Sequence, residues 1–130
     1  MSKQKKKERI AQQASGLFKI SEITDEHIRF SDGSMITFDH CADCCEWNYA
    51  DFEQLDDLAR NALFDTANLA FRAVDGSGFC FGNKDGRMYF VPCYSSQNGW
   101  YSLDIQIYYY YAKLQFTKEV LSFNAEEVEE

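Results

Sequence analysis

The feature that most restricts the fold is an alternation of apolar and polar residues. Three short segments place apolar side chains at every second position: Phe18 and Ile20, Ile28 and Phe30, and Ile36 and Phe38. Because successive side chains of a strand point to opposite faces, this period predicts strands with one buried face. The turn residues Ser31-Asp32-Gly33-Ser34 lie between the second and third segments and predict a hairpin there.

Residues 51–64 follow a helical pattern instead. Asp51 can cap the first turn, and Gln54 lies three residues later at the capping-box position. An apolar stripe at helical spacing follows, made of Phe52, Leu55, Ala59, Ala62 and Leu63. We therefore expect one helix over 51–64.

The second half of the chain predicts further strands and hairpins. Leu69, Phe71 and Ala73 open a strand that ends at the turn residues 75–78. Residues 82–86 join the apolar segment 79–81 to the segment 87–94, and Asn98-Gly99 favours a two-residue turn that leads into 101–111. If Gln97 faces Trp100 across that turn, Phe90 faces Ile107. One buried face then holds Met88, Phe90, Pro92, Ile105 and Ile107. Phe79 and Phe81 join this face if the earlier hairpin keeps the same parity. The other face holds Cys80, Tyr89, Val91 and Cys93.

Length and composition predict one domain. A chain of 130 residues that is 45% hydrophobic can bury one core without a metal or disulfide. The predicted fold class is α+β, a single domain of mainly antiparallel sheet with about six to eight strands and one helix packed on it. We expect residues 1–13 to form a basic arm, disordered or frayed, residues 14–123 to form the domain, and residues 124–130 to form a solvated acidic tail.

Charge and cysteine content indicate which partners are unfavourable and in which cellular compartment we expect the protein. The chain carries a net charge of −8, and its basic and acidic ends cancel each other, so the domain is acidic. Such a surface makes general nucleic-acid binding unfavourable. No apolar segment reaches the length of a membrane span, and no apolar segment follows the basic start as in a secretory signal. Five cysteines, two of them adjacent, do not resemble a disulfide framework. We expect reduced thiols and a cytoplasmic location.

The segment His40-Cys41-Ala42-Asp43-Cys44-Cys45-Glu46 holds most of the reactive side chains. The spacing Cys41-x-x-Cys44 is that of a zinc knuckle, and the candidate metal ligands are His40, Cys41, Cys44 and Cys45. A structural zinc site normally adds a second ligand pair, but Cys80 and Cys93 are not spaced as one. Small buried cysteines are therefore favoured, with no metal and no cofactor. His40 or His27 could activate Cys44, but neither spacing is diagnostic, and no catalytic residue is assigned.

Two short motifs resemble a protein family. Asp43-Cys44-Cys45-Glu46 preceded by His40, together with Asn98-Gly99-Trp100-Tyr101-Ser102, is similar to a domain-of-unknown-function family of phages and bacteria with H-x-Q-D-C-C-E and N-G-Y-Y-S segments. Ala42 stands in place of the glutamine, and Trp100 in place of the first tyrosine. The resemblance implies a phage or prophage setting and two segments that meet in space, but it supplies no activity. The functional surface it implies comprises Asp43, Cys44, Cys45, Glu46, Asn98, Gly99, Trp100, Tyr101 and Ser102.

Two classes of function follow from these observations. The favoured class is a small non-catalytic interaction protein of phage or prophage origin, with an unidentified protein partner or a second copy of itself. The alternative is a cysteine-centred metal-binding or thiol-dependent activity in the segment His40–Glu46. The thiols would be buried in the first case, and they would surround a pocket or an ion in the second.

Overall fold

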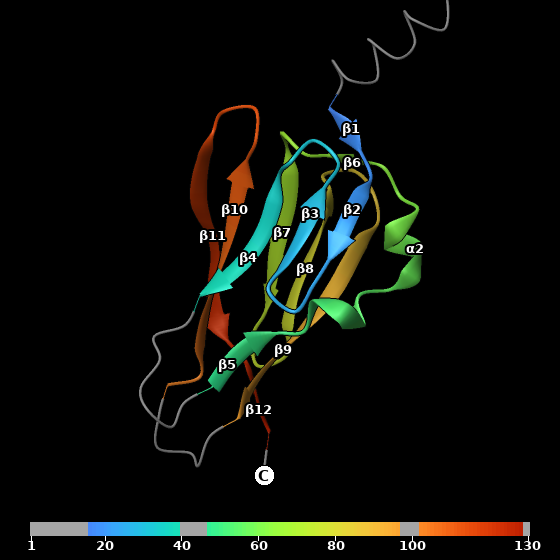
Figure 1. Ribbon diagram of the computed structural model, residues 1–130. Helices are drawn as coiled ribbons and strands as arrows, with labels where there is room; N and C mark the ends of the chain where they lie inside the picture. Colours follow the sequence, from blue (N-terminus) through green and yellow to red (C-terminus); the bar gives the residue numbers. More distant parts are fainter. Residues whose placement is uncertain (1–15, 40–46, 97–101, 129–130) are drawn as a thin grey trace, which may run out of the picture.

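The computed structural model describes residues 16–39, 47–96 and 102–128, and the statements below refer to these (Figure 1). The described residues form twelve strands, one 3-10 turn and one short helix. The elements are β1 (Leu17–Phe18), β2 (Ile20–Ile23), β3 (His27–Phe30), β4 (Met35–Asp39), β5 (Trp47–Ala50), η1 (Phe52–Gln54), α2 (Asp57–Arg60), β6 (Phe64–Asp65), β7 (Leu69–Val74), β8 (Gly78–Asn83), β9 (Met88–Ser96), β10 (Asp104–Tyr111), β11 (Phe116–Asn124) and β12 (Glu126–Val128).

The first five-stranded sheet has the order β11-β10-β4-β3-β2 and is antiparallel throughout. The hairpin predicted at 31–34 is confirmed, because β3 pairs with β4 and Ile28 lies opposite Ile36. Gly33 allows the tight reversal with a φ of 93°, and the Phe30 N–H donates to the Ser34 carbonyl at 2.8 Å. The alternating residues Ile28, Phe30 and Ile36 are all fully buried, as their period predicts.

The second sheet runs β12-β9-β8-β7, and β5 also pairs with β9. The hairpins β7–β8 and β8–β9 confirm the turns expected at 75–78 and 82–86. A third, two-stranded sheet joins β1 to β6, where Phe18 lies opposite Phe64. The fold is therefore mainly antiparallel sheet with one helix, as expected, although it has more strands and more sheets than expected.

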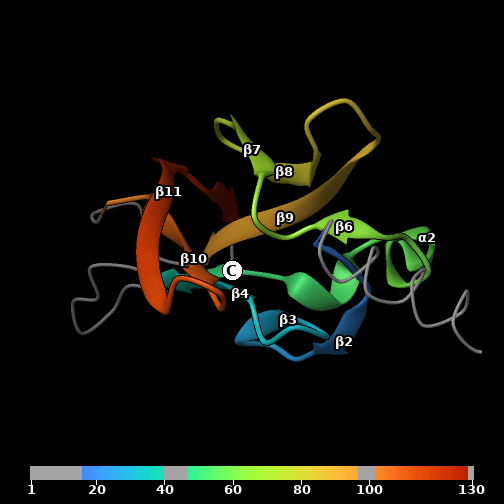
Figure 2. The ribbon, with the colours of Figure 1, turned by 90° about the horizontal axis from the view of Figure 1, so that it is seen from above.

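The core lies between the two large sheets. Figure 2 shows β7, β8 and β9 on one side and β2, β3 and β4 on the other, with β10 and β11 along one edge. The Phe30 ring lies at the centre, and its centroid is 5.3 Å from Phe64, 6.3 Å from Phe81 and 6.4 Å from Tyr109. Edge-to-face aromatic contacts of this kind join residues from four strands into one core.

The predicted hairpin between β9 and β10 is wrong. Both edges of β10 are occupied, by β4 and β11, and β9 pairs with β5, β8 and β12. In β10 the predicted face is buried, since Ile105 and Ile107 are fully inaccessible. In β9 the opposite face is buried: Val91 and Cys93 lie in the core, whereas Phe90 is 41% exposed. Both faces of 88–93 are apolar, so the local pattern did not determine which one turns inward.

The predicted helix over 51–64 is interrupted. The Asp51 side chain accepts a hydrogen bond from Gln54 but caps no backbone N–H, while Asp56 caps α2 by accepting from Leu58 N at 2.9 Å. Phe52, Leu55 and Ala59 are buried, as the stripe predicts, but Leu63 is exposed and Phe64 is buried as part of β6. Tertiary packing of Phe64 overrides the helical preference.

The expected acidic tail is partly structured. Ala125 is buried, and its N–H donates to the Leu103 carbonyl at 2.9 Å. Glu126, Glu127 and Val128 then form β12, parallel to β9, with their side chains exposed. A strand can use backbone hydrogen bonds whatever its side chains are, and the glutamates remain solvated.

Candidate functional site

The sequence-predicted site residues lie mostly outside the described part of the chain. This holds for His40 to Glu46 and for Asn98 to Tyr101, whereas Ser102 is described. Among the described residues there is no group of three or more metal-ligating side chains. Cys93 is fully buried, and burial raises the pKa of its thiol. Cys80 lies opposite Phe90 across the β8–β9 pair, so it faces away from Cys93, contrary to the expectation that they share a face.

The ends that flank the two predicted segments do lie together. Trp47, which follows the first segment, pairs with Ser96, which precedes the second. The buried Asn48 side chain donates to the carbonyl oxygens of Ser102 and Asp104 at 3.0 and 2.9 Å, and its Oδ1 accepts from Ser95. One buried polar residue therefore joins β5, β9 and the start of β10.

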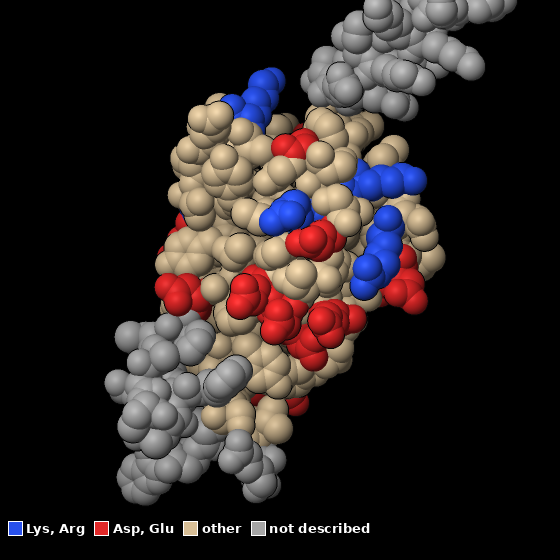
Figure 3. Space-filling view, in the orientation of Figure 1, with Lys and Arg blue, Asp and Glu red and all other residues tan. Residues whose placement is uncertain are grey.

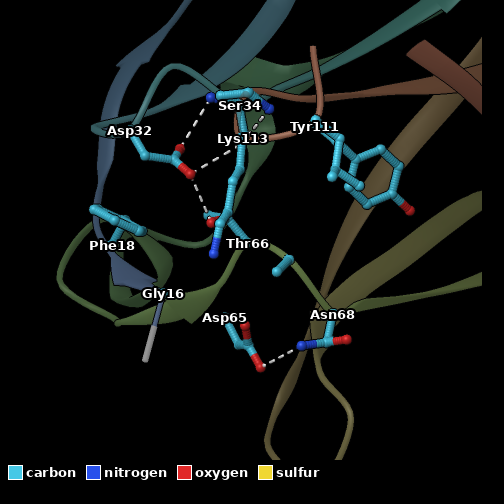
Figure 4. Close-up of a pocket in the computed structure, with 12 residues that line it drawn as sticks. Gly16, Phe18, Asp32, Ser34, Asp65, Thr66, Asn68, Tyr111 and Lys113 are labelled. Atoms are coloured by element: carbon cyan, nitrogen blue, oxygen red, sulfur yellow. Dashed lines mark hydrogen bonds between the residues drawn. The ribbon is translucent and has the colours of Figure 1, made fainter. Parts of the chain in front are cut away.

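A pocket of about 640 Å³ opens between three turns far apart in the sequence (Figure 4). The β3–β4 turn contributes Asp32 and Ser34, the residues after β6 contribute Thr66 and Asn68, and the β10–β11 turn contributes Lys113. Its volume is in the range of small-molecule sites. Sequence analysis assigned Asp32 only to a turn, and no local pattern links it to Thr66 or Lys113.

Asp32 holds these turns in place. Its carboxylate accepts from the Ser34 N–H at 2.9 Å, the Ser34 hydroxyl at 3.0 Å and the Thr66 hydroxyl at 2.7 Å. The Ser34 oxygen in turn accepts from the Ala112 N–H at 3.3 Å. Ser34 and Thr66 are almost fully buried. Within the described residues, the charged side chains that line this pocket are those of Asp32, Asp65 and Lys113.

A second feature is the outer face of β7–β8–β9, which we define as the nine residues at positions that face away from the core on these strands. Cross-strand pairing sets them in three rows: Ala70, Gly82 and Met88; Arg72, Cys80 and Phe90; and Val74, Gly78 and Pro92. The inner rows of the same strands contain the fully buried Phe79 and Phe81. Eight of the nine outer positions are uncharged, and Arg72 is the exception.

Glycines make this outer face flat. A Cβ on Gly78 would lie 3.0 Å from Phe90 Cζ, and a Cβ on Gly82 would lie 3.1 Å from Met88 Sδ. The Phe90 and Met88 side chains therefore lie across the central strand. Phe90 and Val74 remain 41% and 36% exposed.

The outer face on the opposite side of the molecule, formed by β2 and β3, carries charged side chains that pair with one another. Glu22 Oε1 lies 2.6 Å from His27 Nε2 and 3.5 Å from Arg29 Nη1. The His27 hydrogen bond, and then the charge of Arg29, lower the pKa of Glu22. In Figure 3 this side of the molecule shows acidic and basic side chains close together. The two outer faces thus differ sharply in charge.

Comparisons with known proteins gave no relative. No protein-family model, no curated protein and no solved structure matched the chain. Within the described residues, no helix is long and apolar enough to cross a membrane.

Proposed function

We propose that this protein is a non-catalytic interaction protein that docks a segment of another protein on the outer face of β7–β8–β9. The observation that carries the proposal is the apolar character of that face, with Phe90 and Val74 exposed on it. Antiparallel sheets with one solvated face normally place polar residues there. An apolar patch of this kind is typical of a surface that another protein covers.

Arg72 defines the chemistry of the proposed partner. It is exposed, and within the described residues it forms no ion pair and donates only a long hydrogen bond to Cys80 Sγ at 4.0 Å. A guanidinium at the edge of an apolar surface favours a carboxylate, which it can bind with two parallel hydrogen bonds. The docked segment should therefore present apolar side chains around one Asp or Glu.

A second copy of the chain fits this face less well. Each copy carries a net charge of −8, so two copies repel each other at long range. Stacking the face on itself would also bring together two surfaces whose only charge is the same, that of Arg72. We therefore infer a different protein as the partner, in place of the homodimer that the sequence left open.

The phage or prophage origin and the cytoplasmic location belong to the same proposal. The resemblance of the 40–46 and 98–102 segments supports the origin. The free thiols of Cys80 and Cys93 are in keeping with a reducing compartment.

The proposal can be tested by selecting a random peptide library on the full-length protein. We expect the selected peptides to carry an Asp or Glu between apolar residues. Phe90→Ser should weaken their binding by at least about 30-fold, the effect of losing an interface hot spot. Arg72→Glu should instead select Lys or Arg at the acidic position.

Two matched controls separate this face from the rest of the surface. Leu58→Ser removes an apolar side chain from α2 that is more exposed than Phe90, and Lys118→Glu reverses a charge on β11. Neither should alter peptide binding. Peptides without an acidic preference, or peptides bound equally by the Phe90→Ser variant, would refute the proposal. A dimer seen by light scattering and lost in the Phe90→Ser variant would favour a second copy as the partner.

The cysteine-centred activity is a second candidate, supported by the pairing of Trp47 with Ser96, which brings the flanks of both motifs together. Elemental analysis of the purified protein tests it. Zinc that survives dialysis and is lost in the Cys44→Ser variant would support a metal centre at His40–Glu46.

A further inference from the structure

The pocket between the three turns is preformed. Asp32 joins the β3–β4 turn to Thr66, and Ser34 joins the same turn to Ala112 on the β10–β11 turn. Tyr109 adds a further link, because its buried hydroxyl donates to the Thr66 carbonyl at 2.6 Å. A site whose walls are already fixed loses little conformational entropy when a ligand enters.

The two carboxylates of the pocket differ in how well they are satisfied. Asp32 accepts three hydrogen bonds from buried groups, so its charge is used internally. Asp65 accepts one side-chain hydrogen bond, from Asn68 at 3.2 Å, and its Oδ1 is buried without a partner among the described residues. An ionised carboxylate can accept about four hydrogen bonds. Of the two carboxylates, Asp65 is therefore the one that can still accept a hydrogen bond from a cationic group.

A positive charge lines the same pocket from the β10–β11 turn. Lys113 is exposed and forms no ion pair with any carboxylate of the described chain. In Figure 4 Asp65 and Asn68 lie together at one side of the pocket, away from the Asp32, Ser34 and Thr66 group. The pocket thus offers one unsatisfied acidic group and one unpaired basic group, contributed by different turns.

Aromatic residues complete the lining. Phe18 lies on β1, and Tyr111 ends β10. The Tyr111 ring is held by Phe116, stacked with centroids 5.1 Å apart, and by Tyr109, edge-on at 4.6 Å. The Tyr111 ring, held in this way, can receive an apolar or aromatic group without reordering.

We propose that this pocket binds a small zwitterion, an amino acid with an apolar or aromatic side chain. The ammonium group contacts Asp65, the carboxylate contacts Lys113, and the side chain packs against Phe18 and Tyr111. This site is separate from the outer face of β7–β8–β9, so either proposal can fail without the other.

Calorimetric titration of the full chain with four probes tests the assignment. L-phenylalanine and L-leucine carry both charges, phenethylamine lacks the carboxylate, and 3-phenylpropionate lacks the ammonium group. We expect both amino acids to bind and each single-charge analogue to bind at least about tenfold more weakly, the effect of one charge-assisted hydrogen bond.

Variants assign each charge to its residue. In the Asp65→Asn variant, L-phenylalanine and phenethylamine should weaken by about tenfold or more, while 3-phenylpropionate is unaffected. In the Lys113→Met variant, L-phenylalanine and 3-phenylpropionate should instead bind about tenfold or more weakly, while phenethylamine is unaffected. Two variants of exposed residues elsewhere on the surface, Asp57→Asn and Lys118→Met, are the matched controls. Each should leave all four affinities unchanged.

Three results would overturn the proposal. The first is an absence of binding by both amino acids at millimolar concentration to protein with wild-type melting behaviour. The second is phenethylamine or 3-phenylpropionate binding as tightly as L-phenylalanine. The third is an equal response of all probes to Asp65→Asn, which would indicate a structural role for Asp65.

Discussion

Apolar residues on β8 and β9 differ in burial according to the face of the sheet on which they lie. Phe81 lies on the inner row and is fully buried, while Phe90 lies on the outer face and is 41% exposed. Both are phenylalanines in strands with apolar neighbours, and sequence analysis expected both on one buried face. Their energetic roles must therefore differ, and this difference can be measured.

We expect Phe81→Ala to lower the free energy of unfolding by about 3–5 kcal/mol, because it leaves a cavity among Phe30, Phe64 and Tyr89. Phe90→Ala should cost less than about 1.5 kcal/mol, since much of its ring is already in water. Urea denaturation of both variants provides the comparison. An equal cost would place Phe90 in the core and remove the basis of the docking proposal.

The Glu22–His27 pair predicts a pH effect at the opposite outer face. The His27 hydrogen bond and the charge of Arg29 lower the pKa of Glu22 from its ordinary value of 4.5. Because the pKa in the folded state is the lower one, the stability that this pair contributes is present above the unfolded value. It is lost as the pH falls through the folded value.

A carboxyl NMR titration can test this pair directly. In the His27→Ala variant the pKa of Glu22 should rise toward 4.5, with a smaller depression left by Arg29. The same midpoint in both proteins would show that His27 does not hold the carboxylate in solution.

At the scale of elements, β9 is the strand that organises the second sheet. It pairs with β8 over its first half, and with β5 and β12 over its second half. The β12 strand has exposed side chains, so its contribution is made by the backbone and by the preceding Ala125, which is buried.

Removing residues 125–130 should therefore destabilise the protein. The truncation deletes the Ala125–Leu103 hydrogen bond and the β12–β9 pairing, at roughly 1 kcal/mol for each net hydrogen bond lost. We expect a fall in the melting temperature of more than about 5 °C. Removing only residues 129–130 is the matched control and should have no effect. Equal melting temperatures for the two truncations would restore the expectation of a passive tail.

In the described part of the chain, two large sheets and the small β1–β6 sheet share one aromatic core, and β10 is an enclosed strand of the first large sheet. It pairs on both sides, and Ile105, Ile107 and Tyr109 are fully buried. By contrast β2 and β11 are edges of the same sheet, and β12 makes only three residue pairs, all with β9. Stability should therefore be distributed unevenly along the chain.

Native-state hydrogen exchange should reveal this distribution. The amides of Ile105 to Tyr109 should exchange slowly, near the rate set by global unfolding, and those of β12 should exchange much faster. Amides of β12 protected as strongly as those of β10 would indicate a single cooperative unit that includes the C-terminal strand.

The sequence by itself determined the local structure. Period-two alternation located β3 and β4, turn residues located their hairpin and the β7–β8 and β8–β9 turns, and the parity of Ile105 and Ile107 identified the buried face of β10. These features depend on residues a few positions apart, and the chain carries that information directly. The prediction of one helix over 51–64 was wrong because burying Phe64 in β6 required a different local structure.

Only the tertiary structure decided which distant strands pair and where sites form. Asn98-Gly99 predicted a β9–β10 hairpin, yet β10 pairs with β4 and β11, whose registers bury Ile36 and Phe123. With both faces of β9 apolar, the register with β8 placed Val91 beside the buried Phe79 and left Phe90 outside. The pocket likewise joins Asp32, Thr66 and Lys113 from three turns. Contacts between residues so far apart depend on the free energy of the whole fold, which no local period encodes.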